Sequence, residues 1–128
     1  MNTPTADSLQ LTLDAPARIP AGGAAVLTLR ARNAGSTSLT LYLRGRSIAF
    51  DFVVRDGGGR IVWRRLEGQM VPAIVQAVTL DAGRQLELHE TWHPASDLPP
   101  GPYTIVGELL RDEPEPLRTP AARVDVFR

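Results

Sequence analysis

Residues 84–94 read RQLELHETWHP, and this stretch decides the fold. Its letters HETWH match the zinc-protease motif H-E-x-x-H, and His89 and His93 are the only histidines in the chain. That motif holds zinc on a helix, where positions four residues apart share one face. In a strand, with a rise of ~3.3 Å per residue, the two histidines stand ~13 Å apart. They could not share an ion whose ligands lie ~2.0–2.1 Å away.

The residues around the motif favour the strand. Leu86 and Leu88 alternate with polar residues, and Thr91 and Trp92 suit a sheet. A proline follows directly and denies a helix its continuation, and the chain offers no third histidine. We therefore predict a strand over 84–92 and no metal site. Glu90 falls on the apolar side of this strand, which indicates a place near the strand's end or a pairing with an arginine.

The same alternation with period two extends outward along the whole chain. The segments between are turn sequences, among them DGGGR at 56–60, where glycine supplies positive φ for a hairpin. No segment shows a helical stripe. We predict an all-β, antiparallel β-sandwich, a single domain over 8–128 that follows a flexible tail at 1–7. The nine expected strands cover 9–13, 25–31, 39–43, 47–56, 61–66, 74–80, 84–92, 103–110 and 122–127.

The composition excludes several classes of function. The 128 residues include no cysteine, which removes disulfides, thiolate metal sites and a cysteine nucleophile. The 14 basic residues are all arginine and are balanced by 14 acidic residues, so neither a catalytic lysine nor the basic excess of a nucleic-acid binder is present. No apolar run reaches the ~18–20 residues of a membrane span, and no signal peptide is visible, so we expect a cytoplasmic protein.

No catalytic constellation stands out. The five serines lie outside any G-x-S-x-G elbow, and no pair of carboxylates is singled out as a glycosidase pair. The acidic residues Asp112, Glu113 and Glu115 suit a solvated loop better than a catalytic cluster. We expect no enzyme, no catalytic residue and no cofactor.

The aromatic residues have structural explanations. Trp63 and Trp92 lie in alternating apolar runs, so we expect them in the core rather than in an exposed platform for sugar. Tyr103 follows Pro-Gly at the start of a late strand, which is typical of a tyrosine corner with a hydroxyl bonded to nearby backbone.

Several of these segments occur in the order of a known pattern. SIAFDFVVRDGGGRIVWR is followed by a loop, by QAVTLDAGRQLELHETW and by LPPGPYTIVGEL, and together they resemble the BsuPI-type intracellular proteinase inhibitor domain. The resemblance covers about residues 9 to 110. The residues that carry it are Asn33, Asp51, Phe52, Val54, Asp56, Gly59, Val62, Trp63, Gln76, Trp92, Pro100, Gly101 and Tyr103. It departs from the family at RRLEGQMVPA, 64–73, where the family often has an aromatic residue, a serine and a later phenylalanine.

The resemblance implies an immunoglobulin-like β-sandwich of about 7–9 strands and a protein that binds protein. The first hypothesis is an inhibitor of an intracellular protease, of the serine class, that acts through an exposed loop. The candidate loop is 64–73, with Arg64, Arg65, Leu66 and Met70 as anchors and Pro72 stiffening its exit, and 112–120 is the second candidate. A mere connection between strands is the alternative reading of the loop. The alternative function is a structural or adaptor module without inhibitory activity.

Overall fold

The computed structural model describes residues 8–128, which form an all-β structure of eleven strands. The predicted tail at 1–7 lies outside the described residues. Within them, no helix is long and apolar enough to cross a membrane. The strands are β1 (Leu9–Asp14), β2 (Arg18–Pro20), β3 (Ala25–Asn33), β4 (Leu39–Arg44), β5 (Phe50–Arg55), β6 (Ile61–Arg64), β7 (Val75–Leu80), β8 (Gln85–Trp92), β9 (Gly101–Leu109), β10 (Leu117–Arg118) and β11 (Ala122–Phe127).

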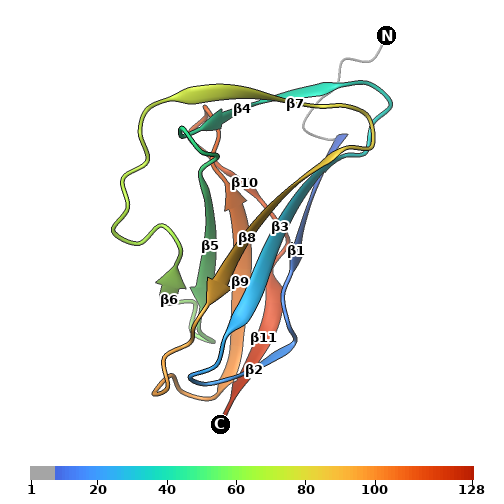
Figure 1. Ribbon diagram of the computed structural model, residues 1–128. Helices are drawn as coiled ribbons and strands as arrows, with labels where there is room; N and C mark the ends of the chain where they lie inside the picture. The colour runs from blue at the N-terminus through green and yellow to red at the C-terminus, as the bar shows by residue number, and fades with distance from the viewer. Residues whose placement is uncertain (1–7) are drawn as a thin grey trace.

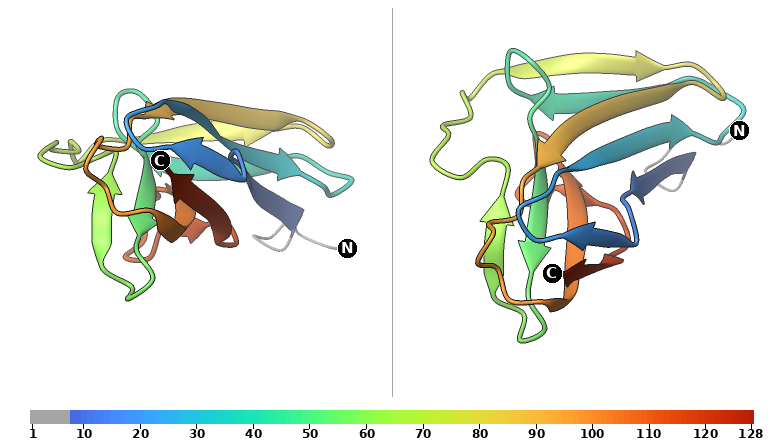
Figure 2. Two further views of the ribbon diagram at one scale, coloured as in Figure 1. Left: turned by 90° about the horizontal axis from the view of Figure 1, so that it is seen from below. Right: turned by 60° about the horizontal axis from the view of Figure 1, so that its bottom comes forward.

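The strands form two packed layers and a ribbon across one end. One layer is the sheet β1-β3-β8, and the other is the sheet β2-β11-β9-β5-β6, to which β10 adds beside β9. Figure 2 shows the two layers stacked, and Figure 1 shows the pair β4-β7 lying across one end of them. This is the immunoglobulin-like sandwich that was expected, with the inner faces of both sheets forming the core.

The stretch at 84–92, which contains the zinc-protease letters, is a strand, as predicted. β8 pairs with β3 along its whole length, from Ala25 opposite Trp92 to Arg32 opposite Gln85. Burial alternates along it up to Trp92, which is 2% exposed, whereas His89 lies on the opposite face. The two histidines of the zinc-protease motif therefore belong to a pleated strand and its exit.

Nine of the eleven strands lie where the alternation predicted them. The other two, β2 and β10, are three and two residues long, too short to show a period. β2 also pairs in parallel with β11, an exception to the antiparallel prediction. Its reason is that the chain crosses from the first sheet to the second after β1, and Ile19 then enters the core beside Val126.

The core lies between the two sheets and consists of a continuous cluster of apolar side chains. Trp92 is buried in this cluster, as predicted, whereas Trp63 is half-buried and packs against it, stacked on Trp92 at 6.2 Å between ring centroids. The hairpin predicted at 56–60 is present, since Asp56 accepts hydrogen bonds from the backbone of Gly58 and Arg60, and Gly59 has a φ of 84°. The fully buried side chains include Phe52, Ile19, Leu27, Leu29, Leu43, Ile105, Leu109, Val54 and Val124.

The tyrosine corner predicts a pH effect. Tyr103 is 5% exposed and its hydroxyl donates to the carbonyl of Pro99 at 2.6 Å. Burial, helped by the charge of Asp56, raises the pKa of the Tyr103 hydroxyl above its ordinary value of 10.0. Between the unfolded-state and folded-state pKa values, the folded protein thus keeps the Tyr103 proton while the unfolded chain has lost it. The contribution of the neutral Tyr103 hydroxyl to stability is therefore complete below pH 10.0 and is lost as the pH rises through the folded-state pKa.

We expect Tyr103→Phe to lower the free energy of unfolding by about 1 kcal/mol at pH 7, because one hydrogen bond is lost. The difference between wild type and variant should shrink in urea unfolding above pH 10.0. Tyr42→Phe is the matched control, because that ring is 60% exposed. An unchanged difference across this pH range would contradict the assignment.

Candidate functional site

The candidate loop connects β6 to β7 and leaves the sandwich beside β5 (Figure 1). It begins with two successive turns, in which the amide of Glu67 donates to Arg64 and the amide of Gln69 donates to Leu66. The side chain of Gln69 also donates to the carbonyl of Arg65 at 3.1 Å. The first part of the loop is thus folded on itself.

Arg64 anchors the start of this loop to a buried carboxylate. Asp51 on β5 is 0% exposed, and its Oδ2 accepts from Arg64 Nε at 2.9 Å and from Nη2 at 2.7 Å. The other oxygen, Oδ1, accepts from the amide of Leu66 at 3.0 Å. The hydrogen bonds to Asp51 raise the pKa of the Arg64 guanidinium above its ordinary value. This guanidinium is thus held against the sheet by Asp51, although its side chain stays 38% exposed.

Arg65 ties the loop to both sheets. Its Nη1 donates to the carbonyl of Phe50 at 2.9 Å, and the guanidinium lies 3.7 Å from the centroid of that ring. Its Nε lies 3.2 Å from Glu90 Oε1 on β8, an ion pair in which the N–H is not aligned for a hydrogen bond. Glu90, on the apolar side of its strand, thus pairs with an arginine, as one of the two expectations had it.

The remaining predicted anchors point differently. Met70 is 96% exposed, Pro72 is exposed and Leu66 is half-buried. At the far end of the loop, Gln76 on β7 donates to the carbonyls of Gly45 and Arg46 at 2.8 and 3.1 Å. Of the five predicted residues, two are therefore anchors within the domain and two are exposed in the outer part of the loop, with Leu66 half-buried between them. The anchors are Arg64 and Arg65, and the exposed residues are Met70 and Pro72.

The second candidate loop, 112–120, meets the start of the first over the outer face of β5 and β9. Glu108 lies opposite Asp51 across these strands, and its Oε2 accepts from Arg118 Nε at 2.9 Å. Glu108 Oε1 lies 3.9 Å from Arg64 Nη2, so one chain of charges joins the two loops. Between them lies a groove of about 380 Å³. Asp51 entered the sequence analysis only as part of the family resemblance, without this role, and Glu108 was missed, because each stands on the polar side of its strand.

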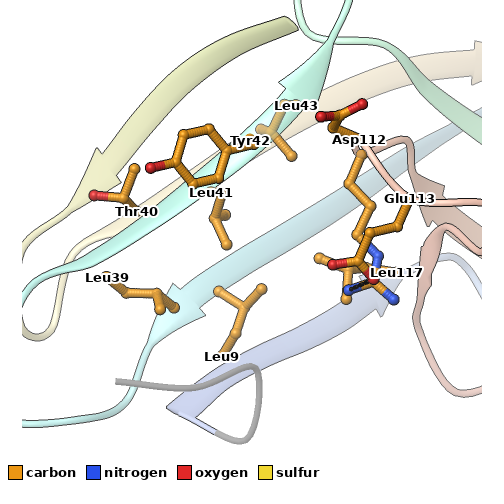
Figure 3. A pocket seen from close by; sticks show the side chains of 10 residues that line it. Leu9, Leu39, Thr40, Leu41, Tyr42, Leu43, Asp112, Glu113 and Leu117 are labelled. Carbon is orange, nitrogen blue, oxygen red and sulfur yellow. Dashed lines mark ion pairs between the residues drawn. The ribbon is translucent and has the colours of Figure 1, made fainter. Parts of the chain in front are cut away.

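A second hollow, of about 270 Å³, is lined by five leucines together with polar and charged side chains. Figure 3 shows Leu9, Leu39 and Leu41 converging on it, with Leu117 closing one side. Asp112 and Glu113 stand at its rim. This hollow lies against the core residues Leu9, Leu39 and Leu43, and it brings no pair of reactive groups together.

The histidines have ordinary surroundings. His89 Nδ1 lies 2.9 Å from the hydroxyl of Thr28 on the neighbouring strand, and His93 is exposed after β8. Within residues 8–128, no three of the His, Asp and Glu side chains form a group that could hold a metal ion.

Solved structures similar to this chain share its fold at low sequence identity. The CARDB domain of the PF1109 protein from Pyrococcus furiosus matches with a TM-score of 0.52 and 14% identity, over 93% of this chain and 87% of that one. The sporulation control protein Spo0M from Bacillus subtilis matches with a TM-score of 0.60 and 10% identity, over 94% of this chain and 50% of that one. The alkylpurine DNA glycosylase AlkC from Pseudomonas fluorescens matches with a TM-score of 0.51 and 18% identity, over 94% of this chain and 31% of that one.

The chain thus spans half or less of the last two proteins, and such likenesses show the fold alone. Among curated proteins, none matches this sequence. The sequence model of the BsuPI family, described as intracellular proteinase inhibitor, matches residues 12–114. That range contains both sheets' central strands and the whole candidate loop. The chain therefore belongs to the BsuPI family of intracellular proteinase inhibitors.

Proposed function

We propose that residues 8–128 act as one β-sandwich domain that inhibits a serine protease in the cytoplasm, by placing the tip of the candidate loop in the protease cleft. The observation that carries this is Met70. At 96% exposed, it is the most exposed of the large apolar side chains in the described part of the chain. Methionine is unbranched and flexible and adapts well to a binding pocket, so Met70 is the side chain of the candidate loop best placed to enter one.

The anchors of the loop support this proposal. Arg64 and Arg65 fasten its entrance to Asp51, Phe50 and Glu90. Gln76 fastens β7 beyond its exit. A loop fixed at both ends loses less conformational entropy on binding, so more of its contact energy appears as affinity. Pro72 removes further freedom next to the tip. In this proposal the two arginines position the loop, and Met70 enters the specificity pocket of the protease.

The alternative is an adaptor without inhibitory activity, and one observation favours it. β6 is an edge strand of its sheet, and its Ile61 and Val62 are 41% and 36% exposed. An edge strand with apolar side chains can accept a strand from another protein. In either case the proposed partner is a protein, and neither a metal, a cofactor, a nucleic acid nor a membrane takes part.

A titration tests the proposal. Increasing amounts of the protein are added to a fixed amount of a subtilisin-like protease, which accepts large apolar side chains, and of a trypsin-like protease, which requires a basic one. We expect stoichiometric loss of activity with the subtilisin-like enzyme only, because the loop tip is apolar and its arginines are engaged within the domain.

The contrary results are equally clear. Preferential inhibition of the trypsin-like enzyme would make Arg64 or Arg65 the contact residue. No inhibition of either enzyme at about 10 µM protein, well above a Kd of about 1 µM, would favour the adaptor.

A further inference from the structure

We propose that the groove between the two candidate loops binds an acidic, partly apolar segment of the partner protein. The inference deepens the proposed function and rests on it for the kind of partner. The groove, called the arginine groove below, is lined by five arginines and three carboxylates, an excess of two positive charges. The arginines are Arg44, Arg55, Arg64, Arg111 and Arg118.

The three carboxylates of the groove already have partners. Asp51 is paired with Arg64 at 2.7 Å, and Glu108 with Arg118 at 2.9 Å. Glu113 is paired with Arg111 at 3.1 Å. Every negative charge of the lining is therefore matched by an arginine of the lining.

Two arginines remain. Within residues 8–128, no carboxylate oxygen lies within 4.0 Å of the guanidinium of Arg44 or Arg55, although both line the groove. A guanidinium offers five N–H donors in a fork that fits a carboxylate with two parallel hydrogen bonds. Arg118 has a second partner in Glu115, just outside the lining, at 3.0 Å, so the positive charges left unmatched are those of Arg44 and Arg55. An acidic side chain of a partner supplies the negative charge that these two lack.

The shape and lining favour a polypeptide segment over a single small anion. A volume of about 380 Å³ is far larger than one carboxylate or phosphate needs. Apolar side chains also line the groove, namely Val53, Ile61, Leu66 and Leu110. A segment that alternates acidic and apolar residues matches both features.

The groove also adjoins the candidate loop. Arg64 and Leu66 line the groove and begin the loop, so a protease that holds Met70 in its cleft brings neighbouring surface over the groove. Because Asp51 and Glu108 hold Arg64 and Arg118 in place, the walls are fixed before binding. The acidic segment therefore adds affinity and selects among proteases of the same specificity.

Fluorescence anisotropy at low salt tests this with a labelled peptide of glutamates interspersed with leucines. The comparison peptide has glutamine in place of each glutamate. We expect the acidic peptide to bind and the glutamine peptide to bind at least about tenfold more weakly, and the difference should fall as salt is added.

The variant R44E/R55E should weaken binding of the acidic peptide at least about tenfold. R32E/R84E changes the net charge equally, on exposed positions that do not line the groove, and should stay within about twofold. R44Q/R55Q adds no repulsion, so its affinity for the acidic peptide should lie between those of the two charge-reversal variants. Thermal unfolding establishes that all three variants fold.

Three results would overturn the inference. They are equal losses in both charge-reversal variants, equal binding of both peptides, and displacement of the peptide by inorganic phosphate at equal molar concentration, which would indicate a site for a single anion. Peptide binding is measured without a protease. If the wild-type protein inhibits a protease but does not bind the acidic peptide, only the proposal of a binding groove is refuted. If it binds the peptide but inhibits no protease, only the proposed inhibitory function is refuted.

Discussion

Replacing Asp51 by alanine is expected to lower the free energy of unfolding by about 2–4 kcal/mol. This carboxylate is 0% exposed and accepts hydrogen bonds from the Arg64 side chain and from the amide of Leu66. The substitution leaves the amide of Leu66 without its acceptor beneath the loop, and the half-exposed Arg64 guanidinium with Glu108, at 3.9 Å, as its nearest carboxylate. The cost of the unpaired amide adds to that of the lost charged hydrogen bonds. Urea unfolding at neutral pH measures the effect.

Two comparisons show whether the loss comes from the pair. Asp97→Ala removes an exposed carboxylate from the loop before β9 and should change stability by less than about 0.5 kcal/mol. The double variant D51L/R64M replaces both charges by apolar side chains and should recover part of the loss, because no charge stays unpaired. A loss below about 1 kcal/mol in Asp51→Ala, against these comparisons, would show that Asp51 is not the anchor.

The fold could be predicted because its signal is local. Each expected strand carries its own alternation, and the inner face of a sheet accepts any apolar side chain of suitable size. β8 illustrates this, since Leu86, Leu88 and Trp92 alone indicate which face is buried. β2 and β10 could not be predicted, because three and two residues hold no period and their pairing depends on strands far along the chain.

The family resemblance predicts the fold well for the same reason. Its polar residues have structural roles that the structure makes visible. Asn33 is 0% exposed and donates to the carbonyls of Thr37 in a loop and Leu80 at the end of β7, Asp51 holds the candidate loop, and Gln76 holds the turn at 45–46. The departures fall in 64–73, where contact with a partner is proposed. A pattern of this kind records packing and anchoring, so it supports the sandwich more strongly than it supports any one target.

The roles within the candidate loop could not be separated by sequence. Arg64 and Arg65 are adjacent arginines before a loop, and nothing in the sequence shows that both guanidinium groups are held by partners within the domain. Their partners lie 13 residues away at Asp51 and, for Arg65, on a strand of the opposite sheet at Glu90. Charge pairs of this kind depend on tertiary structure. The exposure of Met70 depends on it too, because the side chain is exposed only since the surrounding fold packs nothing against it.

Replacing Met70 by aspartate is expected to weaken inhibition of the subtilisin-like protease at least about 100-fold, since it places an unpaired charge in an apolar pocket. Met70 is 96% exposed, so the stability of the domain should stay within about 0.5 kcal/mol of wild type. Met70→Leu should keep inhibition within about tenfold, because leucine fills the same pocket with similar volume.

Val26→Asp is the matched control, since Val26 is 61% exposed on β3 and away from the loop, and it should inhibit like wild type. Inhibition constants measured with each variant decide the matter. If Met70→Asp inhibits as well as Val26→Asp does, the tip of the loop is not the contact, and the segment 112–120 becomes the place to look.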